Sequence, residues 1–132
     1  MVNKTESKSA KTWLKFARHD LDLAFLLNRD KAFADTICYF CHQTIEKTLK
    51  ALLLSKLVFD FPHTHDLEAL MKQCQKFFPD ILNFKENILI LNRYYIETKY
   101  PSDELIDYSR EEAERAIEIT TEIYDFTEKE IS

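Results

Sequence analysis

Polar residues that can bind a ligand or move a proton recur at helical spacing in the middle of the chain. His42, Glu46 and Lys50 are four residues apart, so on a helix they stack on one face, with Gln43 and Tyr39 beside them. A neighbouring stripe is apolar or small: Phe33, Ile37, Cys41, Thr44, Thr48 and Leu52. The polar stripe is therefore either an ordinary exposed face or one wall of a polar groove between helices.

Metal binding is a second chemistry that the sequence raises. Cys38, Cys41 and His42 form a Cys-x-x-Cys-His run, and His63 and His65 follow at the next connection. Structural zinc pairs usually lie on turns, whereas these cysteines fall inside the predicted helix. The sequence therefore predicts buried, inert thiols, with no metal site and no cofactor.

The chain contains no glycine. A Gly-rich phosphate loop and a dinucleotide fingerprint both need glycine, and so do most tight hairpin turns. This absence argues against α/β nucleotide-binding folds and compact β architectures, and it favours helices. With 132 residues, of which 45% are hydrophobic, the chain is predicted to form one domain over residues 1–132. The net charge of −5 gives no overall attraction to nucleic acid.

The N-terminal residues show no pattern of a secretory signal. They are mostly polar, and no segment approaches the roughly 20 apolar residues that cross a bilayer. The three cysteines are an odd number, which does not suit a disulfide framework. We therefore expect a cytoplasmic protein with reduced thiols.

Hydrophobic periodicity predicts five helices, at about 10–28, 33–57, 66–78, 83–98 and from 109 onward. Ala17, Leu21 and Ala24 mark the core face of the first helix. Ser109, three residues before Glu112, gives the last helix a capping-box pattern. Because the connections are short, the simplest architecture is an all-α, up-and-down bundle of four to five helices.

Four short motifs follow one another along the chain. They are Gln43, Glu46, Lys47 and Lys50 in the long helix, then His65-Asp66-Leu67, then Lys99-Tyr100-Pro101, then Glu112-Ala113. Their order and spacing resemble the HEPN domain family (higher eukaryotes and prokaryotes nucleotide-binding) over nearly the whole chain. The resemblance implies a helical bundle that forms a homodimer and serves as a partner of a separate small nucleotidyltransferase. Other relatives are metal-independent ribonucleases of toxin–antitoxin or defence systems.

The ribonuclease branch of that family carries an Arg-x(4–6)-His motif. Arg93 is followed by no histidine in this window, and no histidine occurs after His65. We therefore expect no enzymatic activity of the chain alone and predict no catalytic residue. Two alternatives stay open. One is a divergent ribonuclease that uses Arg93 with His42 or His65, and the other is a structural or antitoxin-like dimerisation module.

The binding-subunit hypothesis predicts a groove for a nucleotide or a nucleic-acid phosphate. Its ligand-binding residues are predicted to be Gln43, Glu46, Lys50, Arg93, Lys99 and Tyr100. The cations would contact phosphate, and tyrosine rings would offer stacking surfaces. The alternative is ordinary surface chemistry, with Glu46 and Lys50 as a weak helix pair and Arg93 and Lys99 paired with nearby carboxylates. Ten phenylalanines and six tyrosines are many for this length and support the expected homodimer.

Overall fold

The computed structural model describes residues 4–61, 64–99 and 108–131, and these form helices joined by short connections. The elements are α1 (Lys4–Arg29), α2 (Ala34–Ser55), α3 (Leu67–Cys74), a 3-10 helix η1 (Pro79–Phe84), α4 (Lys85–Lys99) and α5 (Arg110–Ile131). The predicted all-α helical bundle is confirmed. Among the described residues no helix is long and apolar enough to cross a membrane.

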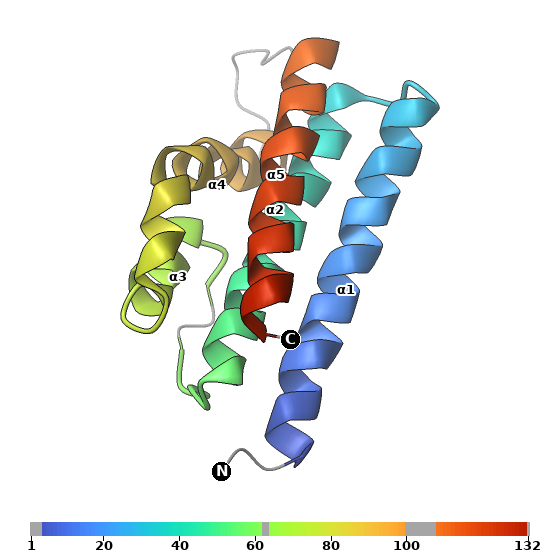
Figure 1. Ribbon diagram of the computed structural model, residues 1–132. Helices are drawn as coiled ribbons and strands as arrows, with labels where there is room; N and C mark the ends of the chain where they lie inside the picture. Colours follow the sequence, from blue (N-terminus) through green and yellow to red (C-terminus); the bar gives the residue numbers. More distant parts are fainter. Residues whose placement is uncertain (1–3, 62–63, 100–107, 132) are drawn as a thin grey trace.

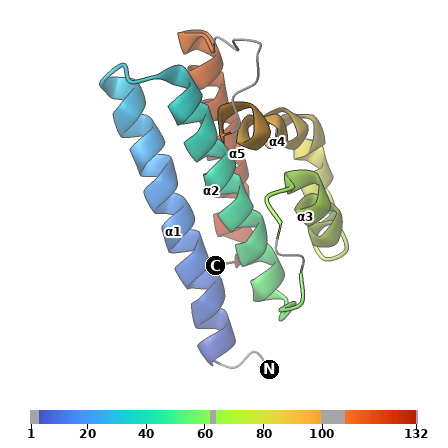
Figure 2. The same ribbon diagram turned by 180° about the vertical axis from the view of Figure 1, so that it is seen from behind.

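The three long helices α1, α2 and α5 lie side by side, and α3, η1 and α4 pack against them (Figure 1). The chain runs along α1, returns along α2, and runs along α5 in the same direction as α2, as the view from behind also shows (Figure 2). Helix α4 lies across the bundle, between α2 and α5 in the order of the chain (Figure 1). Helix α2 contacts α1, α3, α4 and α5, so it forms the centre of the fold.

The central position of α2 explains why its polar stripe is buried. Apolar residues on several sides of the helix are fully buried, including Ile37, Ile45 and Leu49. Burying such side chains stabilises the fold by about 1.5–3 kcal/mol each. A helix covered on several sides carries its polar residues into the interior as well, and His42 and Glu46 are among those buried.

Helix ends follow capping chemistry more than hydrophobic periodicity. The hydroxyl oxygen of Ser109 accepts the backbone N–H of Glu112 at 3.0 Å, as the predicted capping box requires. The long central helix spans 34–55, slightly less than the predicted 33–57. Helix α3 ends at Cys74, earlier than the predicted 78, and Pro79 begins η1, because proline suits the first position of a helical turn.

Two helices end without the glycine that usually adopts the left-handed conformation. Lys31 follows α1 with φ 55°, and Leu57 follows α2 with φ 62°. The bonds from Ala32 N–H to the carbonyl of Leu27 and from Val58 N–H to that of Leu53 close a Schellman-type turn at each end. The backbone geometry is thus kept, although a side chain makes it more costly.

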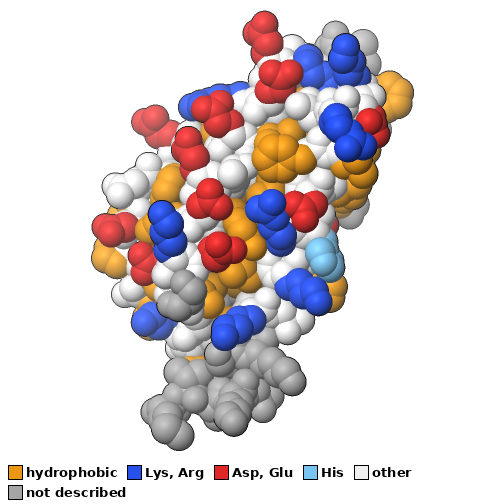
Figure 3. All heavy atoms as spheres, turned by 45° about the vertical axis from the view of Figure 1, so that its right-hand side comes forward, with side chains coloured by type: hydrophobic (Ala, Val, Ile, Leu, Met, Phe, Trp, Pro, Cys, Tyr) orange, Lys and Arg blue, Asp and Glu red, His pale blue; other side chains and the backbone are white. Residues whose placement is uncertain are grey.

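Acidic, basic and hydrophobic side chains are interspersed on the face that includes α1 (Figure 3). Large hydrophobic side chains are exposed in several described elements. They are Phe16, Phe25, Leu26, Phe33, Leu57, Phe59, Phe77 and Leu82.

Candidate functional site

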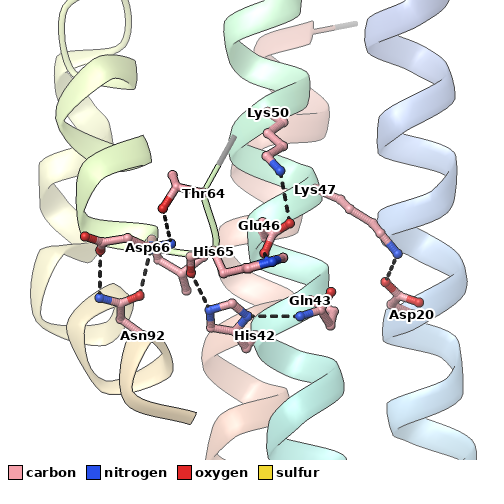
Figure 4. A network of polar contacts seen from close by, with 11 residues as sticks. Asp20, His42, Gln43, Glu46, Lys47, Lys50, Thr64, His65, Asp66 and Asn92 are labelled. Atoms are coloured by element: carbon pink, nitrogen blue, oxygen red, sulfur yellow. Dashed lines mark hydrogen bonds and ion pairs between the residues drawn. The ribbon is translucent and has the colours of Figure 1, made fainter. Parts of the chain in front are cut away.

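Glu46 on α2 is the buried centre of a polar network (Figure 4). Its Oε2 accepts a hydrogen bond from Lys50 Nζ at 3.0 Å, and its Oε1 lies 2.7 Å from His65 Nδ1. The side chains of Glu46 and Lys50 are 7% and 9% exposed, whereas that of His65 is 52% exposed. The network therefore joins a buried ion pair to an imidazole at the surface. Their burial excludes the alternative in which Glu46 and Lys50 form an ordinary surface pair.

His42, one turn before Glu46, holds the backbone that carries His65. Its Nε2 lies 2.8 Å from the carbonyl oxygen of His65, and because a carbonyl only accepts, Nε2 carries the proton. Its Nδ1 can then accept from the Gln43 amide at 3.4 Å. Burial lowers the pKa of His42 from 6.5 to about 4. The ring is therefore neutral near pH 7, as this tautomer requires.

Asp66 and Asn92 fix the same short segment from α3 and α4. Asp66 Oδ1 accepts from the backbone N–H groups of Glu68 and Ala69 at 3.0 and 3.4 Å, which caps α3. It also accepts from Asn92 Nδ2 at 3.0 Å, and Asn92 Oδ1 accepts from Leu67 N–H at 2.7 Å. Three helices thus hold the segment 64–66 in one conformation.

Tyr95 on α4 provides the surface beneath His65. The two rings stack with their centroids 4.3 Å apart and their planes 15° apart. The ring centroids of His42 and Tyr39, both on α2, lie 5.3 and 6.3 Å from that of Tyr95. Because His65 covers it, Tyr95 has little exposed ring face, and the histidine presents the outer surface of this aromatic group.

A cavity of about 450 Å³ opens beside His65. It is lined by Thr64, His65, Asp66, Asn92 and Tyr95. This volume lies within the usual range for small-molecule sites. The cavity therefore joins an aromatic wall to polar groups that the hydrogen bonds above hold in place.

The opposite flank of the α2 stripe faces α1. Lys50 Nζ lies 5.5 Å from the centroid of the Trp13 ring, so this cation is shared between Glu46 and an aromatic face. Lys47 pairs with Asp20 of α1 at 2.5 Å. Both lysines are thus engaged within the fold.

Of the predicted ligand-binding residues, the structure brings Gln43, Glu46 and Lys50 together. Arg93 is exposed on α4, and it does not line the cavity. Lys99 ends α4, but its side chain and the whole of Tyr100 lie outside the part of the chain that the structure describes. Whether these six residues bind a ligand stays a prediction.

The cavity residues Thr64, Asp66 and Asn92 were not predicted as site residues. The signal for the first two was the polar run Thr64-His65-Asp66 directly before a predicted helix. Asn92 has no such signal, because its role depends on the position of α4 against α3.

The cysteines are buried, as the sequence predicts. Cys38, Cys41 and Cys74 are buried and free, and burial raises the pKa of each to about 12. Over the described part of the chain, no group of three or more His, Cys, Asp or Glu side chains is placed to hold a metal ion. His63, considered above as a ligand, lies outside that part.

Comparisons with known proteins agree with this geometry. TT1696 from Thermus thermophilus has a crystal structure that matches with a TM-score of 0.80 and 28% identity, over 91% of this chain and 96% of that one. A crystal structure described as an archaeal HEPN homologue matches with a TM-score of 0.71 and 20% identity, over 93% and 98%. The search of proteins with curated function finds no match. The model of the HEPN domain matches residues 10–131, and the chain therefore belongs to the HEPN domain family.

Proposed function

We propose that this HEPN protein is a nucleotide-binding subunit without catalytic residues of its own, and that it works with a separate small nucleotidyltransferase. The observation that carries the proposal is the cavity beside His65. The imidazole of His65, which lines the cavity, is oriented by Glu46 and stacked on Tyr95 without any ligand present. Preorganised groups of this kind reduce the entropy cost of binding.

In this proposal the predicted residues fall into two roles. Gln43, Glu46 and Lys50 support the cavity from beneath, because their polar groups are engaged with one another or with His42 and His65. Arg93 and Lys99 would face the phosphates, and Arg93 is exposed on the same helix as Asn92 and Tyr95. A guanidinium presents the fork of donors that suits phosphate oxygens.

Calorimetric titration with the four nucleoside monophosphates tests nucleotide binding. We expect at least tenfold weaker binding after His65→Ala or Arg93→Ala. Binding should stay unchanged after His19→Ala and Arg115→Ala, which remove exposed side chains of the same types from α1 and α5. If no monophosphate binds the wild-type protein, the proposal is wrong.

The proposed partner and dimer need separate measurements. Co-expression with the small nucleotidyltransferase encoded nearest to this gene, followed by size-exclusion chromatography, should give a complex that contains both chains. The two proteins eluting apart at micromolar concentration would contradict the partnership. We also propose a homodimer, which the exposed hydrophobic side chains described above support.

A divergent ribonuclease is the second candidate, and one observation favours it. A buried carboxylate that orients an exposed histidine is also the arrangement of a general base, and Glu46 and His65 have this geometry. His42 cannot take that role, because it is fully buried. The candidate therefore requires His65.

A further inference from the structure

The polar groups around the cavity are unequally available to a ligand. Asn92 uses its amide oxygen for Leu67 and its amide nitrogen for Asp66. The hydroxyl oxygen of Thr64 accepts the backbone N–H of Asp66 at 3.0 Å. The acceptor oxygens of Asn92 and Thr64 already serve the fold, so acceptors for a ligand would come mainly from His65 and Asp66.

Asp66 and His65 still offer hydrogen-bond acceptors. Three donors occupy Oδ1 of Asp66, and Oδ2 has no partner among the described residues. His65 directs Nδ1 to Glu46, so in the neutral ring the outward Nε2 carries a lone pair. Two acceptors on adjacent residues favour a ligand that donates hydrogen bonds, such as a sugar diol or an amino-bearing base.

The exposed part of His65 adds a stacking surface. One face of its ring lies on Tyr95, yet 52% of the side chain is exposed. The exposed part is therefore the other face and the Nε2 edge. A planar base on that face would extend the stack, and such contacts contribute about 1–3 kcal/mol per base.

The same cavity is unfavourable for phosphate. None of its five described lining residues is lysine or arginine, and the Asp66 carboxylate brings a negative charge. The buried cation Lys50 already pairs with Glu46, the carboxylate that contacts His65. Among these lining residues, an anionic group inside the cavity would thus meet a like charge and no cation that compensates it.

We propose that the cavity binds the nucleoside part of a nucleotide, with ligand hydroxyl or amino groups donating to Asp66 and His65, and that the phosphates stay outside it. This inference rests on the proposed nucleotide binding and assigns the part of the ligand that is recognised. It also gives Asp66 a second role besides capping α3.

Competition titrations separate the two parts of the ligand. The protein is loaded with the tightest-binding nucleoside monophosphate, and the matching nucleoside, ribose 5-phosphate and inorganic phosphate are added in turn. We expect the nucleoside to compete within about threefold of the monophosphate and the two phosphate compounds to be at least tenfold weaker. Competition by ribose 5-phosphate or phosphate, with none by the nucleoside, would overturn the inference and leave nucleotide binding intact. If no monophosphate binds at all, both proposals fail.

Asp66→Asn tests the acceptor directly. Asparagine is also a good helix N-cap, so the fold should be kept, while an amide nitrogen replaces the free acceptor Oδ2. We expect nucleoside affinity to fall at least tenfold with an unchanged unfolding midpoint. Asp60→Asn, an exposed aspartate of the α2–α3 connection, is the matched control and should bind as the wild type does. Equal nucleoside affinity of a folded Asp66→Asn variant and the wild type would contradict the assigned role.

Discussion

Glu46 Oε1 and His65 Nδ1 lie 2.7 Å apart, although the residues are 19 positions apart in the chain. The contact joins the central helix to the segment before α3, and it orders the exposed imidazole. Glu46 also pairs with Lys50, so one carboxylate holds both the buried ion pair and the imidazole of His65.

Removing the charge of Glu46 should destabilise the fold. In Glu46→Gln the ammonium of Lys50, whose side chain is 9% exposed, loses its charge partner. We expect the free energy of unfolding in urea to fall by about 3 kcal/mol, because an uncompensated buried charge is costly. Glu46→Gln combined with Lys50→Met should recover most of this loss. If the free energy of unfolding of Glu46→Gln lies within about 0.5 kcal/mol of the wild-type value, the ion pair contributes no more than an exposed pair does.

His42 should make stability depend on pH. Burial lowers its pKa from 6.5 to about 4, so the unfolded chain takes up this proton at higher pH than the folded chain does. The stabilisation is therefore complete above pH 6.5 and is lost as the pH falls toward 4, by about 3 kcal/mol in total. Urea unfolding of wild type and His42→Gln over this range measures the difference. If the free energy of unfolding changes with pH in the same way in both proteins, His42 is not the source of the pH dependence, because the other titrating groups are common to both.

The left-handed residue after α1 offers a stabilising substitution. Lys31 has φ 55°, a conformation that costs most side-chain-bearing residues about 1–2 kcal/mol and glycine far less. Part of the gain is offset by the greater freedom of glycine in the unfolded chain. We expect Lys31→Gly to raise the free energy of unfolding by about 0.5–1 kcal/mol and the neighbouring Ala32→Gly to lower it. A loss of stability in Lys31→Gly would show that the lysine side chain contributes more than its backbone conformation costs.

The fold was predictable because its signals are local. Ala17, Leu21 and Ala24 repeat at helical spacing and are buried, and Ser109 caps α5 as its position before Glu112 indicates. The end of α3 was placed wrongly because Phe77 and Phe78 continue the apolar pattern after the helix has ended. Periodicity records which side chains are apolar, but it does not record where the backbone leaves the helical conformation.

The candidate site was only partly predictable because it depends on distances between helices. The spacing of Glu46 and Lys50 predicts their ion pair, since both lie on one helix. That the pair is buried follows from the packing of α2 against four other helices. The stacking of His65 on Tyr95 and the bond between Asp66 and Asn92 join segments about 26–30 residues apart in the chain, and no local pattern carries that information.

The purified protein is expected to lack ribonuclease activity. Metal-independent cleavage needs a positioned proton-transfer group, and the Arg-x(4–6)-His motif that would provide one is absent. No histidine follows Arg93. Single-stranded RNA incubated with the protein in EDTA should stay intact. Cleavage that disappears in both His65→Ala and Arg93→Ala would instead establish the divergent ribonuclease.

The protein is expected to be a homodimer in solution. Phe33 at the start of α2 is 80% exposed and Phe59 after α2 is 55% exposed, and exposed aromatic rings are characteristic of contact surfaces. A closed two-fold contact would remove such rings from water on both copies at once. Light scattering at micromolar concentration should therefore give twice the chain mass. Phe33→Glu and Phe59→Glu, measured separately, should identify the surface, because a charge placed in a buried contact weakens association while an exposed one does not. A wild-type mass equal to one chain would contradict the dimer.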